Sequence, residues 1–203
     1  MVLNKHFIRS TAILFLLVFA VYSRPVCADP QPDEYTYATP VNNIPGLGNF
    51  AQVSDELYRG EQPTAEGFAQ LKKMGIKTII NLRASYPDAK FIKGLGFYYL
   101  YIPMEANFVG DKEAVAFLKA MENKKYAPFF VHCQHGADRT GTMVGVYRMT
   151  VQGWPREKVQ GELSRFGFHE IFFNLRRYLR KVDPKALQNK VDLAPEPEFE
   201  YIP

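Results

Sequence analysis

The sequence predicts a single α/β domain in which helices flank a central, mainly parallel sheet. Short β-branched or aromatic runs alternate with longer stretches whose apolar residues recur at helical spacing. Strands that alternate with helices run parallel, because the chain crosses back over the sheet between them. The length of 203 residues suits one domain, and 47% hydrophobic with 23% charged residues is typical of a globular protein.

The first predicted helix covers residues 64–74, where Phe68, Leu71 and Met74 share one face and Gly75 provides a stop signal. The later elements follow from the same two patterns. They are predicted strands at 77–82, 97–102 and 129–132, and predicted helices at 87–93, 113–125, 140–152, 155–166 and 171–182.

Residues 1–28 have the layout of a secretory signal peptide. Lys5 and Arg9 form a basic start, residues 12–22 form an apolar run, and small residues lead to a cleavage site after Ala28. The apolar run is shorter than the roughly 20 residues that a membrane-spanning helix needs. We therefore expect an exported protein, periplasmic or secreted, with no stable membrane span after cleavage; an uncleaved anchor is the alternative.

The rest of the chain divides by composition. Residues 29–50 are rich in Pro, Asn and Gly and predict an extended lead-in, while the C-terminal segment is rich in Pro and Glu. The expected organisation is a signal peptide at 1–28, the lead-in at 29–50, the domain itself at 51–183, and a loosely ordered tail at 184–203.

The charge of the mature chain is close to balanced. The whole chain has 25 basic and 21 acidic residues, and three of the basic ones, Lys5, Arg9 and Arg24, lie in the predicted signal peptide. Nucleic-acid binding domains carry a clear basic excess on one face. We therefore expect no nucleic-acid partner, and the charge does not otherwise indicate a function.

The stretch at 131–141 reads Val-His-Cys-Gln-His-Gly-Ala-Asp-Arg-Thr-Gly and joins a predicted strand to a predicted helix. Backbone N–H groups of such a loop converge on one point, and the helix N-terminus adds positive potential, which together suit a phosphate. The same field stabilises a thiolate, so Cys133 is a candidate nucleophile. Arg139 can donate two parallel hydrogen bonds to phosphate oxygens.

Other residues of this loop have narrower expected roles. Thr140 can hydrogen-bond the sulfur when it leaves, and His132 supports the loop. His135 either binds a second negative group or is merely exposed, and Asp138 either takes part directly or is a surface residue at the helix start. The expected phosphate-binding set is Gln134, His135, Gly136, Ala137, Asp138 and Arg139.

This stretch resembles the His-Cys-x5-Arg-Thr signature loop of cysteine-dependent protein tyrosine and dual-specificity phosphatases. Residues 57–63 (Leu-Tyr-Arg-Gly-Glu-Gln-Pro) and 75–83 are similar to the N-terminal half of the small dual-specificity group. The resemblance covers about residues 50–182 and is closest to short exported bacterial phosphatases of the TpbA type. It implies that Cys133 forms a phosphocysteine, that Arg139 binds the phosphoryl oxygens, and that neither a metal nor another cofactor is needed.

Some tyrosine phosphatases carry a Trp-Pro-Asp acid loop before the signature cysteine. The single tryptophan here, Trp154, comes after Cys133, which favours the smaller dual-specificity architecture. Arg59 and Arg83, within the matching N-terminal segments, either support the loop or line the edge of the pocket.

The same resemblance implies a general acid upstream of the nucleophile, usually an aspartate. Glu105 lies 28 positions before Cys133, and Asp111 lies 22 positions before it, where a helix N-cap is expected. We favour Glu105 and keep Asp111 as the alternative. A glutamate departs from the family's usual aspartate, so turnover or leaving-group preference can differ.

The expected function is hydrolysis of phosphotyrosine, extending to phosphoserine and phosphothreonine, in exported or membrane proteins. One alternative is a phosphatase for inositol phosphates or another small phosphate ester. The other is a catalytically silent phosphate-binding module. The expected partner is thus a phosphorylated protein or a small phosphate ester, and the oligomeric state stays open.

Overall fold

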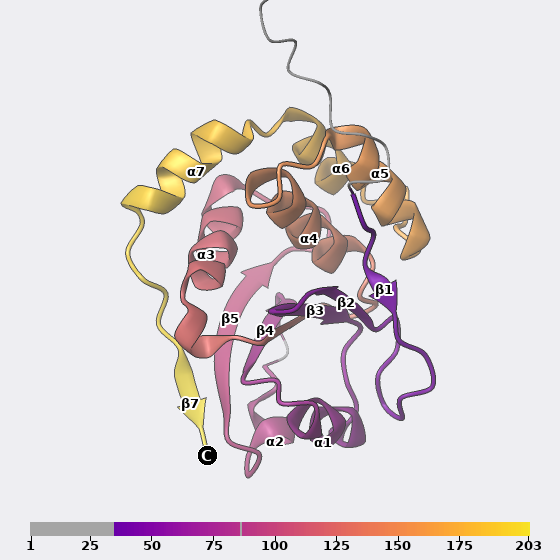
Figure 1. Cartoon of the computed structure of the whole chain (residues 1–203), viewed down its shortest axis with the longest axis vertical. Coiled ribbons are helices and arrows are strands. Elements are labelled where there is room, and N and C mark those ends of the chain that lie inside the picture. The colour runs from indigo at the N-terminus through magenta and orange to yellow at the C-terminus, as the bar shows by residue number, and fades with distance from the viewer. Residues whose placement is uncertain (1–34, 86) are drawn as a thin grey trace, which may run out of the picture. The chain divides into compact units, whose positions relative to one another are not determined.

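A computed structural model describes residues 35–85 and 87–203. The expected signal peptide at 1–28 and the first part of the lead-in lie outside these residues. Seven strands of the described part form one sheet in the order β1-β2-β3-β6-β4-β5-β7 (Figure 1). Their bounds are β1 Thr39–Pro40, β2 Ala51–Ser54, β3 Leu57–Gly60, β4 Thr78–Arg83, β5 Phe97–Met104, β6 Phe129–His132 and β7 Glu200–Ile202.

The four central strands β3, β6, β4 and β5 run parallel, and the edge strands β1, β2 and β7 pair antiparallel. The predicted α/β class with a mainly parallel sheet flanked by helices is confirmed. β6 is buried along its whole length, as expected for a strand covered by helices on both faces. In the register His132 lies opposite Gly60, the last residue of β3, and Asn81 of β4. β3 and β6 therefore end together at the start of the Cys133 loop, and β4 continues beyond them to Arg83.

The helices cover both faces of this sheet. α1 and α2 lie on one face and α3 to α7 on the other (Figure 1), and a separate hydrophobic cluster fills each side. Their bounds are α1 Ala65–Lys73, α2 Ala89–Ile92, α3 Asp111–Glu122, α4 Asp138–Thr150, α5 Arg156–Arg165, α6 Phe173–Lys181 and α7 Pro184–Leu193, with a short 3-10 helix at Lys124–Tyr126. None of the helices in the described ranges is both long and apolar enough to cross a membrane.

The C-terminal segment differs from the loosely ordered tail that its composition predicts. Residues 184–193 form α7, which starts where the Asp183 carboxylate accepts hydrogen bonds from the N–H groups of Lys185 (2.9 Å) and Ala186 (3.3 Å). Leu187 and Val191 of this helix are buried. The apolar positions of the segment therefore fix it to the domain despite its proline and glutamate content.

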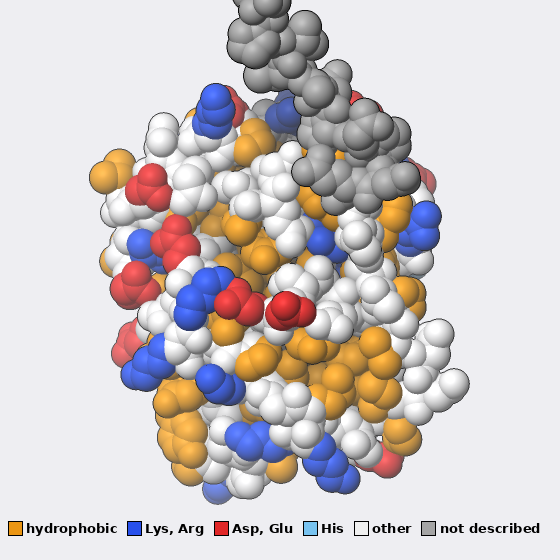
Figure 2. Space-filling model, in the orientation of Figure 1, with side chains coloured by type: hydrophobic (Ala, Val, Ile, Leu, Met, Phe, Trp, Pro, Cys, Tyr) orange, Lys and Arg blue, Asp and Glu red, His pale blue; other side chains and the backbone are white. Residues whose placement is uncertain are grey.

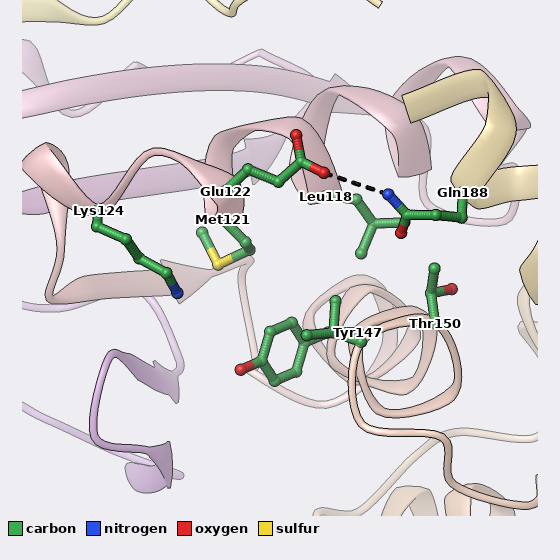
Figure 3. Close-up of a pocket in the computed structure, with 8 residues that line it drawn as sticks. Leu118, Met121, Glu122, Lys124, Tyr147, Thr150 and Gln188 are labelled. Atoms are coloured by element: carbon green, nitrogen blue, oxygen red, sulfur yellow. Dashed lines mark hydrogen bonds between the residues drawn. The ribbon is translucent and has the colours of Figure 1, made fainter. Parts of the chain in front are cut away.

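Two contacts show how this segment joins the rest of the fold. Gln188 Nε2 of α7 donates to Glu122 Oε1 of α3 at 3.2 Å, above a pocket of about 460 Å³ that Leu118, Met121 and Tyr147 help to line (Figure 3). Further along, β7 adds an edge strand to β5, with Ile202 opposite Phe97. The segment thus completes both the helical layer and the sheet.

The lead-in also contains structure that its composition does not predict. Residues 39–40 form β1, and the following strands β2 and β3 form an antiparallel pair before the first helix. The sequence predicts no strand before residue 77. The importance of this pair is that β3 lies directly beside β6 and carries Arg59 under the Cys133 loop.

Candidate active site

The Cys133 loop connects the end of β6 to the start of α4. Cys133 follows His132, the last residue of β6, and α4 begins at Asp138. The Cys133 side chain is only 1% exposed. The loop lies at the carboxyl ends of the parallel strands, where α/β sheets commonly bind ligands.

The carbonyl groups of this loop all accept hydrogen bonds from the surrounding structure. The six donors lie on both sides of the loop in the sequence and turn the carbonyls of residues 133–138 outward. They are His132 Nδ1 (to Cys133, 3.2 Å), Gln62 N (to Gln134, 3.3 Å), Asn49 Nδ2 (to His135, 3.0 Å), Arg59 Nη2 (to Gly136, 2.7 Å), Gly141 N (to Ala137, 3.0 Å) and Thr142 Oγ1 (to Asp138, 2.8 Å).

The N–H groups of the same loop have the opposite arrangement. Within the described residues, those of 134–137 donate to no other group. Successive free N–H groups beside a helix N-terminus form an anion-binding concavity. The loop therefore has the electrostatics that a phosphate group needs.

Gly136 is required by the geometry of this loop. Its φ is +67°, and a Cβ at this position would lie 2.4 Å from the carbonyl carbon of Gly60 in β3. Real side chains do not tolerate such an approach to backbone atoms, and positive φ disfavours them independently. The glycine lets the loop pack directly against the end of β3.

Arg139 links the loop to the segment that carries the expected general acid. Its side chain is half-buried, and Nη1 donates to the carbonyl oxygen of Met104 at 3.2 Å. Met104 is the last residue of β5, and the exposed Glu105 follows it directly. The structure thus brings the backbone at Glu105 beside the arginine of the phosphate-binding loop.

Asp111 is placed differently from the expectation. Gly110, not Asp111, is the N-cap of α3, and Asp111 is the first helical residue. Its carboxylate accepts a hydrogen bond from Tyr178 Oη at 2.8 Å and pairs with Lys190. The hydrogen bond from Lys190 is the main cause that lowers the pKa of Asp111, and Tyr178 adds to it. A carboxylate held in its ionised form is a poor proton donor, so this geometry favours Glu105.

The Asp138 carboxylate is bound to His169, in the connection between α5 and α6. It accepts from the His169 N–H at 2.8 Å, and His169 Nδ1 lies 3.0 Å from Asp138 Oδ2. The exposed His135 ring lies 5.8 Å from the His169 ring, centroid to centroid. Sequence reasoning did not single out His169, because nothing in its local sequence indicates contact with the loop.

The Thr140 hydroxyl is buried and has no hydrogen-bond partner among the residues that the structure describes. The expected role of Thr140, a hydrogen bond to the Cys133 sulfur as it leaves, stays a prediction. The hydroxyl is free of competing partners, which leaves it available to a departing sulfur.

Arg59 lies buried beneath the loop, with 0% of its surface exposed. Besides its bond to the Gly136 carbonyl, its guanidinium carbon lies 3.8 Å from the centre of the Phe166 ring. Nε and Nη1 have no hydrogen-bond partner in the described part of the chain. Burial lowers the pKa of Arg59 to about 10, while the negative charges of Glu162 and Cys133 oppose this change. Of the two roles considered for Arg59, loop support matches this position.

His132 belongs to a buried network that sequence analysis did not find. Its Nε2 lies 2.8 Å from Asp88 Oδ2, and both side chains have 0% exposure. Gln62 Nε2 donates to Asp88 Oδ1 at 2.9 Å, and Arg83 Nη1 donates to Gln62 Oε1 at 2.6 Å. Because Nδ1 donates to the Cys133 carbonyl, either His132 is an imidazolium or Asp88 carries the proton between them. In both cases His132 holds the loop backbone, as expected.

Comparisons with known proteins agree with this site. A family model described as "DSP-PTPase phosphatase fused to NAD+ Kinase" matches residues 48–171. The dual specificity protein phosphatase TpbA of Pseudomonas aeruginosa (strain UCBPP-PA14) is 30% identical over 143 residues, covering 69% of this chain and 65% of TpbA. The inositol diphosphatase SIW14 of Saccharomyces cerevisiae is 32% identical over 130 residues, covering 59% of this chain and 46% of SIW14. The chain thus spans less than two thirds of the length of both relatives.

Solved structures give the same relationship. The crystal structure of P. aeruginosa TpbA has a TM-score of 0.68 at 26% identity and covers 77% of this chain and 96% of that chain. A crystal structure of a TpbA variant in complex with pTyr has a TM-score of 0.68 at 25% identity and covers 80% and 99%. Because the matched region contains both the outward-turned loop and the strands that support it, this chain belongs to the DSP-PTPase phosphatase family.

Proposed function

We propose that this protein is an exported, metal-independent phosphatase that hydrolyses phosphotyrosine, and also phosphoserine and phosphothreonine, in proteins. The observation that carries the proposal is the Cys133 loop, whose carbonyls are all bound from outside while the N–H groups of 134–137 are free among the described residues. The TpbA structure in complex with pTyr supports phosphotyrosine as the substrate group.

In the first chemical step, the Cys133 thiolate attacks the phosphorus atom. A P–S bond forms and the bond from phosphorus to the tyrosyl oxygen breaks, while Arg139 and the loop N–H groups bind the phosphoryl oxygens. Glu105 gives its proton to the leaving oxygen. The products are the free hydroxyl of the substrate and a phosphocysteine.

In the second step, a water molecule attacks the phosphocysteine. The Glu105 carboxylate takes a proton from this water, a P–O bond forms and the P–S bond breaks. The departing sulfur leaves as a thiolate, to which Thr140 donates a hydrogen bond. Phosphate is released and both catalytic groups return to their starting state.

The first test is hydrolysis of p-nitrophenyl phosphate by residues 29–203 in the presence of a chelator. We expect turnover in the wild type and its loss in Cys133→Ser. Trapping of ³²P-labelled phosphate on the wild-type protein by rapid acid quench identifies the phosphocysteine. A wild type that turns over neither this ester nor a phosphotyrosine peptide excludes the enzyme and leaves the silent phosphate-binding module.

The choice of general acid needs a substrate with a poor leaving group, because p-nitrophenol leaves with little protonation. On a phosphotyrosine peptide, Glu105→Gln should reduce kcat about 100-fold or more, as expected for loss of a general acid. Asp111→Asn is the matched control and should keep kcat within a few-fold of wild type. The reverse pattern assigns the acid to Asp111.

Export is the part of the proposal that depends on residues 1–28. Its support is the basic, apolar and small-residue pattern of the sequence. We expect the mature protein to begin at Asp29 and to appear in the exported fraction when the full chain is expressed. N-terminal sequencing that begins at Met1, or a protein retained with the membranes, excludes cleavage and supports the anchor.

The alternative substrate class is a small phosphate ester. Its support is the similarity to SIW14 and to the inositol diphosphatase DSP2 of Oryza sativa subsp. japonica, which is 25% identical over 154 residues, covering 72% of this chain and 74% of DSP2. Rates on inositol phosphates that exceed those on phosphotyrosine peptides would favour this class.

A further inference from the structure

A second pocket, of about 660 Å³, lies beside the phosphate-binding loop. Arg83, Lys90 and Phe91 line it, together with Gln62 and the hydroxyl residues Thr64 and Ser85. Of the described residues that line it, none is Asp or Glu. We call it the Arg83–Lys90 pocket.

The position of this pocket follows from the sheet. Arg83 is the last residue of β4, the direct neighbour of β6, which leads into Cys133. Gln62 connects the two sites, because its N–H donates to the Gln134 carbonyl at 3.3 Å while its side chain lines the pocket. The Arg83–Lys90 pocket and the Cys133 loop therefore share Gln62 as a common wall.

The two cations of the pocket are held differently. Arg83 Nη1 donates to Gln62 Oε1 at 2.6 Å, which orients a partly exposed guanidinium at the pocket wall. Lys90 is exposed, and its Nζ lies 4.8 Å from the centre of the Phe91 ring. In Figure 2 the end of the domain that carries α1 and α2 shows mostly Lys and Arg among its charged side chains.

The nearest buried acid does not cancel this charge. The Asp88 carboxylate has 0% exposure and is bound by His132 and Gln62. The two cations, with no acid among the described lining residues, favour an anion such as phosphate. Arginine binds phosphate through two donors, and lysine adds a compact positive charge.

We propose that the Arg83–Lys90 pocket binds a second phosphate group of the substrate while the first lies in the Cys133 loop. The preferred substrates are then molecules with two phosphates a short distance apart. This inference rests on the proposed phosphatase function and specifies its substrate class.

The test compares matched substrates with one and two phosphates. In the small-ester arm these are myo-inositol 1-phosphate and myo-inositol 1,4-bisphosphate. In the peptide arm they are one peptide with a single phosphotyrosine and the same peptide with two. The readout is the ratio of kcat/KM for the doubly to the singly phosphorylated substrate, measured by phosphate release.

We expect this ratio to exceed one in the wild type in at least one arm. It should fall about tenfold in both Lys90→Gln and Arg83→Gln, since each removes a charge-assisted contact to the second phosphate. Lys93→Gln is the control. Lys93 follows α2, is exposed and does not line the pocket, so its ratio should equal that of the wild type.

The two arms distinguish the source of the second phosphate, a small ester or a peptide. Equal ratios in the wild type, Lys90→Gln and Arg83→Gln in both arms overturn the proposal. Titration calorimetry of myo-inositol 1,4-bisphosphate and the doubly phosphorylated peptide against Cys133→Ser, with and without Lys90→Gln, separates this result from failure of the proposed function. Weaker binding in the double variant supports the pocket even without turnover, and equal binding of both probes overturns it.

Discussion

Arg59 lies below the Cys133 loop, and its replacement by methionine separates loop function from fold stability. Methionine has a similar length and an apolar, flexible side chain, so it can fill much of the space. It removes the hydrogen bond to the Gly136 carbonyl at 2.7 Å and the stacking on Phe166 at 3.8 Å. It also removes the buried positive charge that attracts the Cys133 thiolate.

The effect on the free energy of unfolding should be small, because the cost of burying the Arg59 charge opposes the favourable contacts that its guanidinium makes. Burial lowers the pKa of Arg59 from 12.5 to about 10, which corresponds to roughly 3 kcal/mol against the charged form. The charged hydrogen bond contributes about 1.5–3 kcal/mol and the desolvated cation–π contact about 2 kcal/mol. The net loss is then about 2 kcal/mol at most, a change in Tm of less than about 8 °C for a domain of this size.

The effect on activity should be much larger. The buried Gly136 carbonyl loses its donor, and a shift of about 1 Å in a catalytic loop can lower the rate about 100-fold. We expect kcat/KM for p-nitrophenyl phosphate to fall about 100-fold.

Arg59→Lys is the matched variant, because lysine keeps the charge and loses the planar stacking. Lysine lacks the planar guanidinium that reaches the Gly136 carbonyl and stacks on Phe166, so kcat/KM should stay low in this variant too. A methionine variant with kcat/KM within threefold of wild type refutes the positioning role. A variant that loses its cooperative thermal transition shows instead that Arg59 mainly stabilises the fold, and it refutes the predicted balance of energies.

Three further predictions concern the loop and its surroundings. Gly136→Ala should lower kcat/KM by at least about 100-fold and Tm measurably, because its Cβ would lie 2.4 Å from Gly60 and its φ is +67°; wild-type kinetics would contradict this geometry. Asn49→Gly removes the side-chain amide that donates to the carbonyls of His135 (3.0 Å) and Phe166 (3.1 Å). Glycine readily adopts the positive φ of 48° at this position, so we expect kcat/KM to fall about tenfold with little change in Tm. Asp111→Asn should cost about 1 kcal/mol at neutral pH. Since the folded pKa of Asp111 is lowered, this difference should disappear as the pH falls through that value, and a difference that persists in acid would contradict the ion pair.

Local patterns predict most of the fold, and they fail where a segment owes its structure to distant partners. Strands β4, β5 and β6 and most helices were predicted because their apolar spacing is visible within each segment. β3 was not, because Arg59 and Gly60 suggest a surface loop, whereas both are buried in the structure. α7 contains a helix start signal, Asp183 followed by Pro184. It was not predicted because the C-terminal segment as a whole is rich in Pro and Glu. β7 forms because its backbone pairs with the edge of β5, a contact that the local sequence does not indicate.

The candidate site divides in the same way. The loop from His132 to Thr140 is continuous in the sequence, so its residue types and spacing indicate a phosphate site directly. The groups that shape it, Asn49, Asp88 and His169, come from separate segments, and each looks like an ordinary polar loop residue. Only the folded chain brings them to the loop, which is why sequence reasoning did not find them.

The charges around the loop indicate separate roles for Arg59 and Arg139. Three acidic side chains near the loop have bound partners: Asp88 contacts His132, Glu162 forms an ion pair with Arg148, and Asp138 contacts His169. Among the described residues, neither Arg59 nor Arg139 forms an ion pair. Arg59 is fully buried and donates to the Gly136 carbonyl, whereas Arg139 is half-buried and donates to the Met104 carbonyl. A buried cation without an ion pair is costly, and for Arg59 the negative charges of Glu162 and, to a smaller extent, Cys133 oppose that cost. Arg59 therefore supports the loop through the Gly136 carbonyl, which leaves Arg139 and the free N–H groups for the phosphate itself.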